Sequence, residues 1–366
     1  MNKKGSPGGV RKKSVRRKGH AVTIHVVAER AGVSPMTVSR VVNRSGNVRE
    51  ATRTRVLHAV KELGYTPNLA ASTLAAARVA RIALIYTNPS AAYLRELLVG
   101  ALRGAARNSV QLVVDSWEGH DVETERVAVQ ALAKSVAGVI LPPPLCESKP
   151  LIAELVRAGV AVVAIASERF AGQISTVHID DFRASRELTE YLIGLGHARI
   201  GYIKGDPSQA DSMRRYEGFL SAMKAAGIEQ RRQFVEQGHF TYRSGLVAAE
   251  KLLSLRQRPT AIIAANDDMA AAVISAAHRQ GLIVPRDLSV VGFDDSSAAT
   301  MVWPELTTVR QPTACMADQA IDLLLHGIRN RAGKERVLVD HVVAHVLVRR
   351  DSAAAPLPPS GSVPPA

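Results

Sequence analysis

Residues 26–43 read VVAERAGVSPMTVSRVVN, and this stretch decides the fold of the N-terminal part of the chain. It predicts two short helices joined by a tight turn, because Gly32 tolerates the positive φ found at a helix C-terminus and Ser34 is a favourable N-cap. Pro35 then stands at the first position of the second helix, where its missing N–H costs nothing. A helix-turn-helix needs a small residue where the helices cross, a glycine in the turn and an apolar residue under the second helix. These positions are Ala28, Gly32 and Val38.

A third helix is expected to follow, with Glu50 in its first turn, Val56, Val60 and Leu63 on one face, and Gly64 at its end. Three short helices form one small core and leave the outer face of the second helix free. That face carries hydroxyls, an amide and an arginine, which suit phosphate and base-edge contacts in a major groove. The alternative is an ordinary helical hairpin with a solvated polar face. Our candidates for DNA contact in this stretch are Ser34, Pro35, Met36, Thr37, Ser39, Arg40 and Asn43.

The charge of the chain is unevenly distributed. The formal net charge is +14, and residues 1–22 hold eight Lys and Arg and no acid. Residues 23–81 add nine basic and three acidic side chains, so the rest of the chain is balanced. All the excess positive charge thus accompanies the helix-turn-helix, which predicts a polyanionic partner for the N-terminal part alone. Residues 1–22 are expected to be a disordered basic arm that either contacts phosphates or only aids solubility.

Two cysteines, Cys146 and Cys315, are too few for a disulfide framework and predict a reducing compartment. No apolar run is long enough to span a membrane, and the N-terminus lacks a clean signal-peptide pattern. The chain has no phosphate-binding GxxxxGK[ST], GxGxxG, HExxH or GxSxG motif. His341 and His345 are expected on one face of a strand, as structural residues rather than metal ligands.

From residue 81 onward, short runs rich in Val and Ile alternate with amphipathic helices. This pattern is typical of parallel sheets covered by helices on both faces, and the strands are too many for one compact sheet. We therefore predict two α/β subdomains. The expected strands are residues 81–86, 110–115, 136–141, 160–166, 174–179, 199–204, 261–265 and 288–293. The expected helices are residues 94–107, 123–134, 151–158, 182–195, 216–226, 244–255 and 269–280.

Polar residues follow several of these strands, at the edge where ligands of such sheets bind. Converging Asp, Asn and Arg side chains with an aromatic platform suit a polyhydroxylated ligand such as a sugar. Two alternatives stay open: the acids cap the helices that follow, or they act as acid/base groups or metal ligands of an enzyme. The polar groups are Asp180-Asp181, Arg214-Arg215, Asn266-Asp267-Asp268 and Asp294-Asp295, with Phe240 or Tyr242 as the aromatic.

The ordered set of motifs resembles the lac repressor/galactose repressor (LacI/GalR) family of bacterial transcription regulators over about residues 23–351. The stretches that carry the resemblance are AERAGVS at 28–34, TVSRVVN at 37–43, LGYTPN at 63–68, LGH at 195–197, RYEGF at 215–219, AND at 265–267 and SVVGFDD at 289–295. The resemblance implies an N-terminal helix-turn-helix DNA-binding domain with a hinge helix. It also implies an α/β effector domain like periplasmic sugar-binding proteins, with two subdomains and parallel sheets.

The resemblance assigns roles to individual residues. Pro35 and Met36 stand at the two base-reading positions, and neither offers a hydrogen-bond donor there, so readout is expected to depend on Arg40 and on DNA shape. Asn47 joins the family's near-backbone contacts. Residues 66–75 become the hinge helix, in which Leu74 wedges into a central minor-groove step and kinks the DNA. Asn68 and Ala71 complete our DNA-contact candidates, and the implied effector contacts are Arg215, Phe240, Asn266 and Asp294.

The chain departs from the family pattern in three places. Val26 stands where an Asp usually opens the first helix. Ala166-Ser167 replaces the acid that some sugar-binding members carry after the strand at 160–165, so no specific sugar is implied. The Pro-rich C-terminal tail lacks a leucine heptad, which favours a dimer over a tetramer.

We therefore expect a cytoplasmic, homodimeric, sequence-specific repressor without a cofactor, which binds a palindromic operator under the control of a small effector, a sugar in our interpretation. The expected domains are 1–22 (basic arm), 23–65 (helix-turn-helix), 66–80 (hinge helix and linker), 81–352 (effector binding and dimerisation) and 353–366 (disordered tail). The alternatives are an exported sugar-binding protein of a transport system, which needs a signal peptide and no helix-turn-helix, and a sugar-processing enzyme, which needs turnover.

Overall fold

The chain divides into two compact units, Met1–Arg78 and Val79–Ala366. A computed structural model describes residues 24–42, 48–63, 80–87, 90–117, 122–329 and 337–357.

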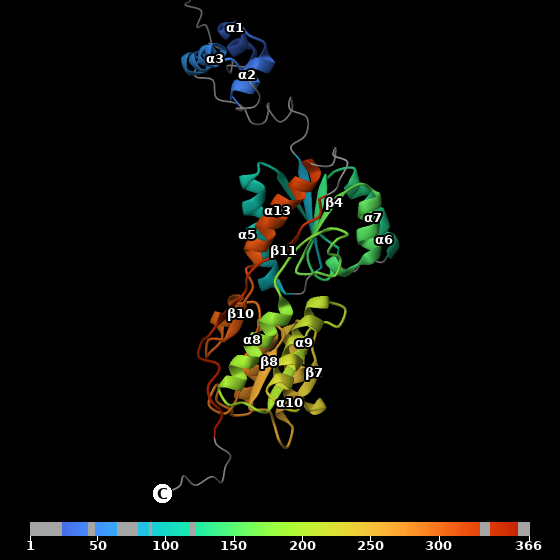
Figure 1. Ribbon diagram of the computed structural model, residues 1–366, viewed down its shortest axis with the longest axis vertical. Helices are drawn as coiled ribbons and strands as arrows, with labels where there is room; N and C mark the ends of the chain where they lie inside the picture. The colour runs from blue at the N-terminus through green and yellow to red at the C-terminus, as the bar shows by residue number, and fades with distance from the viewer. Residues whose placement is uncertain are drawn as a thin grey trace, which may run out of the picture. The chain divides into compact units, whose positions relative to one another are not determined.

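The first unit is a bundle of three helices around one small core (Figure 1). Its helices are α1 (Ile24–Ala31), α2 (Pro35–Val42) and α3 (Glu50–Glu62). Val27, Val38 and Val56, one from each helix, are completely buried in this core. Gly32 has φ +64°, and the N–H of Val33 closes the end of α1 on an α1 carbonyl at 3.0 Å. The turn between α1 and α2 is thus formed by the glycine that the sequence predicts.

Parallel strands form the first sheet of the second unit, in the order β11-β5-β4-β3-β1-β2. The strands are β1 (Arg81–Tyr86), β2 (Gln111–Ser116), β3 (Gly138–Leu141), β4 (Ala161–Ile165), β5 (Ser175–His178) and β11 (Asp340–Val342). Every residue of β3, β4 and β5 is buried, as expected for strands covered on both faces. Figure 1 shows α5 (Ala91–Arg107) and α13 (Thr313–Arg329) on one face and α6 (Val122–Ala133) and α7 (Lys149–Arg157) on the other.

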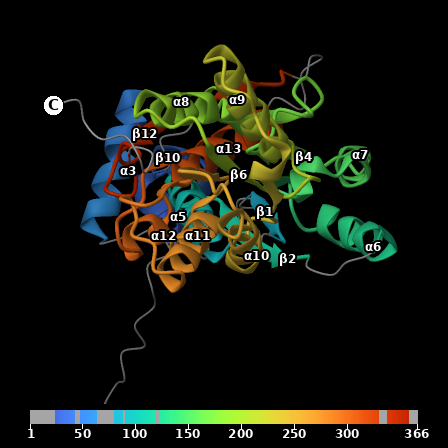
Figure 2. The same ribbon diagram turned by 90° about the horizontal axis from the view of Figure 1, so that it is seen from below.

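A second parallel sheet has the order β7-β6-β8-β9. Its strands are β6 (Ile200–Lys204), β7 (Val235–Gln237), β8 (Ala261–Ala264) and β9 (Ser289–Val291). Figure 2 shows one helix pair on each side of this sheet. The pairs are α8 (Asp181–Gly194) with α9 (Ala210–Ala225), and α10 (Tyr242–Leu253) with α11 (Asp267–Arg279). The two predicted α/β subdomains are therefore present, and the fold class predicted from the sequence is confirmed.

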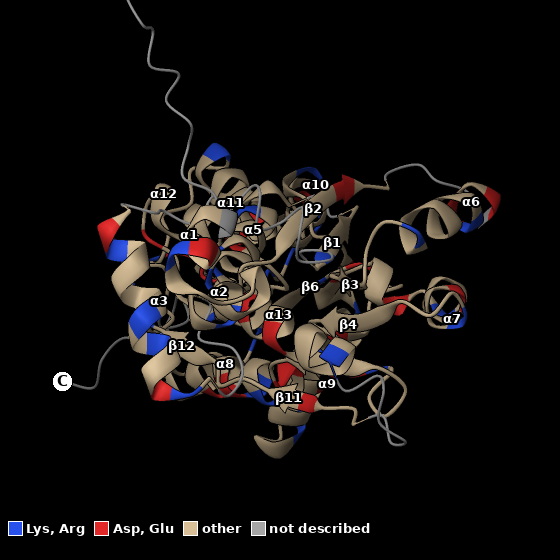
Figure 3. Cartoon of the chain, turned by 90° about the horizontal axis from the view of Figure 1, so that it is seen from above, with Lys and Arg blue, Asp and Glu red and all other residues tan. Residues whose placement is uncertain are grey.

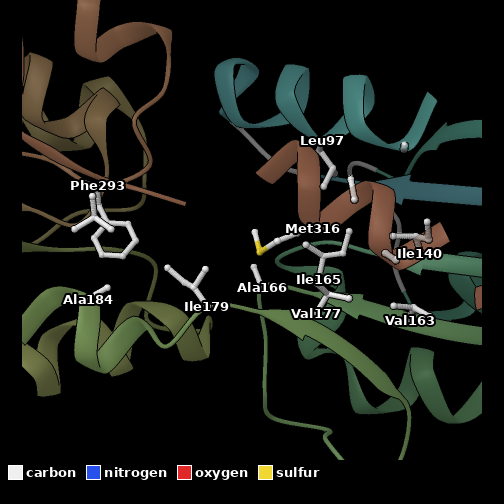
Figure 4. Packing of buried hydrophobic residues seen from close by; sticks show 14 of the residues in the cluster. Leu97, Ile140, Val163, Ile165, Ala166, Val177, Ile179, Ala184, Phe293 and Met316 are labelled. Atoms are coloured by element: carbon white, nitrogen blue, oxygen red, sulfur yellow. The ribbon is translucent and has the colours of Figure 1, made fainter. Parts of the chain in front are cut away.

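Three segments of the described chain connect the subdomains, after β5, after β10 (Thr308–Arg310) and after β11. Strand β10 pairs antiparallel with β12 (Val346–Val348) beside these connections. Figure 4 shows the buried cluster that runs through the junction, from Phe293 and Ala184 past Ile179, Ala166 and Met316 to the first sheet. The junction is thus packed with apolar side chains.

Helices α5 and α13 pack closely because α5 carries glycines at the contact. A Cβ atom built on Gly100 would lie 1.9 Å from the carbonyl oxygen of Ala314, and one on Gly104 would lie 2.7 Å from an oxygen of Asp318. Arg107 extends the contact with ion pairs to Asp318 at 2.9 Å and Asp322 at 2.7 Å. The position of α5, and of the residues at its N-terminus, is fixed by this contact.

Several elements differ from the prediction. Helix α9 begins at Ala210 rather than residue 216, and α5 begins at Ala91 rather than residue 94. The first turn of α9 contains Asp211 and Ser212, which hide the apolar period, whereas α5 opens with Ala91 and Ala92. His341 lies in β11, but His345 lies in the segment before β12, so the prediction that they share one strand face is wrong. Residues 297–348 form five elements: α12 (Ser297–Met301), β10, α13, β11 and β12. The sequence analysis gave no bounds for any helix or strand in this part of the chain.

Part of the expected disordered tail is ordered. The carbonyl of Ala354 lies 2.9 Å from Nε2 of His197 and accepts the hydroxyl of Ser289 at 3.0 Å. The side chain of Ser352 is buried and accepts the N–H of Thr307 at 2.8 Å. Residues 352–357 are thus held against the second subdomain, and residues 358–366 lie outside the described chain.

Candidate functional site

The first candidate surface is the outer face of α2. Ser34 caps the helix, since its hydroxyl accepts the N–H of Thr37 at 3.2 Å and lies 3.0 Å from the Thr37 hydroxyl. Met36 is 64% exposed and Arg40 is exposed, whereas Val38 on the opposite face is completely buried. Pro35, Thr37 and Ser39 are half-buried along the same helix. The outer face of α2 therefore presents an apolar side chain, Met36, and a cationic one, Arg40, to its surroundings.

The other DNA-contact candidates lie outside the described residues. They are Asn43, Asn47, Asn68, Ala71 and Leu74, and their roles remain predictions from the sequence. In the described part of the first unit, α3 carries both basic and acidic side chains, which Figure 3 shows in blue and red. One of these acids, Glu62, is bound by Arg30 of α1 at 2.7 Å, which ties the two helices together.

The second candidate site lies in the second unit and is organised around Arg215. Its side chain is 3% exposed, and its Nε donates to Asp181 at 2.7 Å while its Nη1 donates to the carbonyl of Ala265 at 2.7 Å. Its guanidinium carbon lies 3.8 Å from the ring centroid of Phe293. Asp211 and Asp294 approach it less closely, at 3.5 Å and 3.8 Å. One guanidinium therefore neutralises only part of three buried carboxylates.

The four predicted effector residues come together in the structure. Arg215, Phe240, Asn266 and Asp294 all line one cavity. The Asn266 amide is held in place, because its Oδ1 accepts the N–H of Met269 at 3.0 Å and its Nδ2 donates to the carbonyl of Phe240 at 3.0 Å. Phe240 and Asp294 have φ values of +57° and +118°, which non-glycine residues rarely adopt. Such strain persists only where surrounding contacts impose it, and it is common at binding sites.

Other lining residues were missed by the sequence analysis. They are Ser90, Tyr93, Pro143, Gln209, Asp211 and Gln311. Ser90 and Tyr93 belong to the start of α5, and Asp211 to the first turn of α9, both of which begin earlier than predicted. An N-cap signal at Ser90, followed by an unbroken helix period, was available for α5. Gln311 follows β10 in a connection between the subdomains, and no local pattern marks it.

The cavity is small in this structure, at about 30 Å³. Two polar contacts join the subdomains beside it. The hydroxyl of Ser90 donates to Asp268 of α11 at 2.9 Å, and Nε of Arg214 lies 2.9 Å from Glu168 of the loop after β4. A hexose is larger than a single water-sized space, so these contacts and the neighbouring side chains must move before one enters.

Burial changes the protonation of the cavity's acids. It raises the pKa of Asp211 to about 7 and that of Asp294 well above its ordinary value, although Arg215 opposes the shift in both. It also raises the pKa of Asp267, to about 7, against hydrogen bonds from Thr308 and Ser296. Burial similarly raises the pKa of the Tyr93 hydroxyl. The site therefore retains protons near neutral pH, where exposed carboxylates have lost theirs.

The structure bears on the capping and enzyme alternatives. Asp180 caps α8 by accepting the N–H of Arg183 at 2.9 Å, and Asn266 caps α11 while lining the cavity, so capping and lining coexist. Asp295 is bound by Arg310 and Arg350, each at 2.6 Å.

Among the described residues, no group of three or more His, Cys, Asp or Glu side chains is arranged to hold a metal ion. In the same residues, no helix combines the length and apolarity that crossing a membrane requires.

Comparison with known proteins gives a family. Residues 23–68 match the family described as bacterial regulatory proteins, lacI family, and residues 189–353 match a periplasmic binding protein-like domain. Catabolite control protein A of Priestia megaterium is 34% identical over 304 residues, which cover 83% of this chain and 91% of that protein. The chain belongs to the lacI family of bacterial transcription regulators. The resemblance inferred from the sequence motifs is thereby confirmed.

Other members of the lacI family are similar over nearly their whole length. The transcriptional regulator CelR of Thermobifida fusca is 35% identical over 338 residues, covering 89% of this chain and 97% of CelR. A solved CelR–cellobiose complex superposes with a TM-score of 0.69 and 33% identity, covering 91% of this chain and all of that one. The lac repressor dimer bound to operator and the anti-inducer ONPF gives a TM-score of 0.70 with 30% identity, covering 92% and 100%.

Proposed function

We propose that this lacI-family regulator is a cytoplasmic homodimeric repressor without enzymatic turnover, and that it binds a palindromic operator under the control of a sugar effector. The observation that carries the proposal is the pair of surfaces described above. Helix α2 buries its apolar face and exposes its polar one, and a separate unit holds a polar cavity around a buried arginine. We retain the domain limits 23–65, 66–80 and 81–352 as part of this proposal.

DNA recognition is assigned to α2 and the hinge. Met36 and Arg40 are exposed on α2, where an apolar side chain suits a thymine methyl and a guanidinium suits guanine or phosphate. The concentration of positive charge in the first 81 residues supports attraction of a phosphate backbone to this end of the chain. Leu74 is assigned to a central minor-groove step, as the family resemblance implies.

Effector binding is assigned to the Arg215 cavity. The CelR structure holds cellobiose, a sugar, and the lac repressor structure holds the anti-inducer ONPF, and this chain covers both over their full length. Arg215, Asn266 and Asp294 supply fixed polar groups, and Phe240 supplies an aromatic face. A few polar groups placed on an aromatic wall are the usual composition of a sugar site.

The homodimer is supported by an exposed apolar surface on the second subdomain. Met301 is 80% exposed and Trp303 is 78% exposed, and Tyr242 and Ile274 line the same hollow as Trp303. Large exposed apolar side chains that cluster in this way mark interaction surfaces. A second copy of the chain would cover them and place two heads for a two-fold symmetric site.

Control of DNA binding would come from the two subdomains. The Ser90–Asp268 and Arg214–Glu168 contacts cross from one subdomain to the other, so they form only when these surfaces meet. An effector that binds one arrangement better than the other shifts the population between them, and the coupling to DNA is reciprocal. Both induction and corepression are compatible with this scheme.

The test is selection of bound sequences from random double-stranded DNA by the full chain at near-physiological salt. We expect a palindromic site with a flexible central step. Enrichment of no site would contradict sequence-specific binding and leave charge alone as the basis of DNA affinity. Leu74→Ala is expected to weaken binding to the selected site and to reduce its bending. Unchanged affinity and bending would remove the assigned role of Leu74.

A further inference from the structure

The charge in the walls of the Arg215 cavity is strongly unbalanced. Asp181, Asp211 and Asp294 surround the guanidinium, and their side chains are only 8%, 8% and 11% exposed. Among the cavity's lining residues Arg215 is the single cation, against the two carboxylates Asp211 and Asp294. Three acids around one base cannot all be neutralised by it, and burial favours the protonated forms of Asp211 and Asp294 until a further cation lies beside them.

Arg215 has little capacity left for an anionic ligand. Its shortest bonds go to Asp181 and to the carbonyl of Ala265, both at 2.7 Å, and neither of these residues lines the cavity. One face of its guanidinium is covered by the ring of Phe293 at 3.8 Å. A phosphate or carboxylate ligand would therefore lie beside acids that already share the single positive charge of Arg215, and this repulsion disfavours its binding.

Two buried polar atoms in the cavity wall have no partner among the described residues. They are the hydroxyl of Tyr93 and Oε1 of Gln311. The two side chains are 7% and 5% exposed, and both line the cavity. The amide nitrogen of Gln311 is used, since it donates to Asp294 at 2.5 Å, so only its acceptor oxygen is left. A buried acceptor without a donor is costly, and a ligand that brings a donor removes that cost.

The free hydrogen-bonding capacity is thus mostly for accepting. Oε1 of Gln311 can only accept, the Tyr93 hydroxyl can donate or accept, and Asp211 and Asp294 become pure acceptors when a cationic ligand draws them into their ionised forms. The ring of Phe240 lies in the same wall and offers an aromatic face, with the guanidinium carbon of Arg215 at 5.7 Å from its centroid. An ammonium group has three donors and no acceptor, and it is attracted both to carboxylates and to aromatic faces.

We propose that the effector carries a protonated amine beside its hydroxyl groups, as amino sugars do, and that Asp211, Asp294 and Gln311 hold this ammonium group. The inference rests on the proposed function and specifies the ligand class of the same cavity. Burial raises the pKa values of Asp211 and Asp294, and an ammonium group beside them would oppose that shift by favouring their ionised forms. Ala166-Ser167 after β4 replaces the acid that some sugar-binding members carry there. In this chain Asp211 supplies an acid to the cavity from α9 instead.

The test compares matched sugars on the full-length protein by titration calorimetry at neutral pH. The pairs are glucosamine with glucose, galactosamine with galactose, and mannosamine with mannose, each with its N-acetyl derivative. In at least one set we expect the amino sugar to bind about tenfold or more tightly than both neutral partners, the range of a charge-assisted hydrogen bond. Equal or tighter binding of the neutral sugars, or no binding of any amino sugar at millimolar concentration, would overturn the inference.

Two variants locate the effect. Asp211→Asn is expected to remove most of the preference for the amine, because it deletes one carboxylate at nearly constant shape. Glu217→Gln removes a carboxylate from the same helix α9, but that residue pairs with Arg214 and does not line the cavity, so the preference should remain. If Asp211→Asn does not fold, the comparison on the unmodified protein still decides.

The same sugars separate this inference from the proposed function. A neutral sugar that changes operator binding would contradict the amine and leave the effector-controlled regulator intact. An amino sugar that binds the cavity without any change in operator affinity would support the amine and contradict the regulatory link.

Discussion

Nε of Arg215 and a carboxylate oxygen of Asp181 lie 2.7 Å apart, and neither side chain is exposed by more than a tenth. This pair joins α9 to the N-terminus of α8 and places the guanidinium at the wall of the cavity. Burial raises the pKa of Asp181, and the charge of Arg215 opposes that shift. The pair therefore bears both on the stability of the fold and on the proposed ligand site. The free energy of unfolding tests the first, and the effect of sugars on operator affinity tests the second.

Removal of the arginine should cost much stability. Arg215→Ala leaves three buried carboxylates without their cation, and we expect a loss of about 3–5 kcal/mol in the free energy of unfolding, measured in urea. Arg214→Ala is the matched control, because the neighbouring arginine pairs with Glu168 and Glu217 at the surface and should cost about 1 kcal/mol or less. Equal losses in the two variants would contradict the assigned role of Arg215.

Arg40 should determine sequence preference rather than general DNA affinity. Arg40→Ala on α2 is expected to weaken binding to the selected operator by about 1–3 kcal/mol and to reduce the preference over a scrambled site. Arg55→Ala removes the same charge from the exposed surface of α3 and should affect both DNAs equally. Fluorescence anisotropy with both duplexes gives the two ratios, and a preserved preference in Arg40→Ala would exclude base readout by this residue.

Gly205, which follows β6, should tolerate no side chain. A Cβ on Gly205 would lie 2.0 Å from the Phe240 ring, so Gly205→Ala must displace that ring, and we expect a loss of about 1–3 kcal/mol. Gly194→Ala at the end of α8 meets no atom within 4 Å and should cost nothing or stabilise the helix. Thermal unfolding of both variants tests this, and a neutral Gly205→Ala would show that Phe240 is not held against the backbone.

Stability should depend on pH through the buried acids. Burial raises the pKa of Asp211 to about 7, so between about pH 4 and 7 the folded state binds more protons here than the unfolded state. By linkage this contribution to stability is present at low pH and is lost as pH rises through 7. His197, whose pKa burial lowers, acts in the opposite direction. The contribution of Asp211 is therefore isolated by comparing the unmodified protein with a variant that lacks only this carboxyl.

Asp211→Asn should gain unfolding free energy relative to the unmodified protein as pH rises from 5 to 8, because its side chain does not ionise. Urea unfolding over this range measures the difference. Parallel curves for the two proteins would show that Asp211 does not titrate in this window.

Local signals predicted the helix-turn-helix well. Gly32, Ser34 and Val38 act through the turn, the cap and the core beneath α2, and each of these depends on a few neighbouring residues. The parallel strands were predictable for a similar reason, since strands buried on both faces need continuous Val and Ile. The start of α9 was not, because its first turn carries the buried polar residues Asp211 and Ser212, of which Asp211 lines the cavity.

The cavity itself was only partly predictable. Arg215, Phe240, Asn266 and Asp294 were among the residues that the strand ends indicated, the family resemblance selected them, and the structure brings them together. Tyr93 and Gln311 were missed because they lie more than two hundred residues apart in the sequence and meet only where the subdomains join. No periodicity or cap near Gln311 reports that contact, which depends on the tertiary fold.

The central claim is that a ligand at Arg215 controls binding of DNA by α2. The most direct measurement is the affinity for the selected operator with and without each sugar, for the unmodified protein and for Arg215→Lys, which keeps the charge but loses the planar donor set. We predict that one sugar changes the affinity of the unmodified protein by about fivefold or more. Arg215→Lys should bind the operator normally in the absence of sugar and lose this response. An undiminished response in Arg215→Lys, or no response to any sugar, would contradict the account.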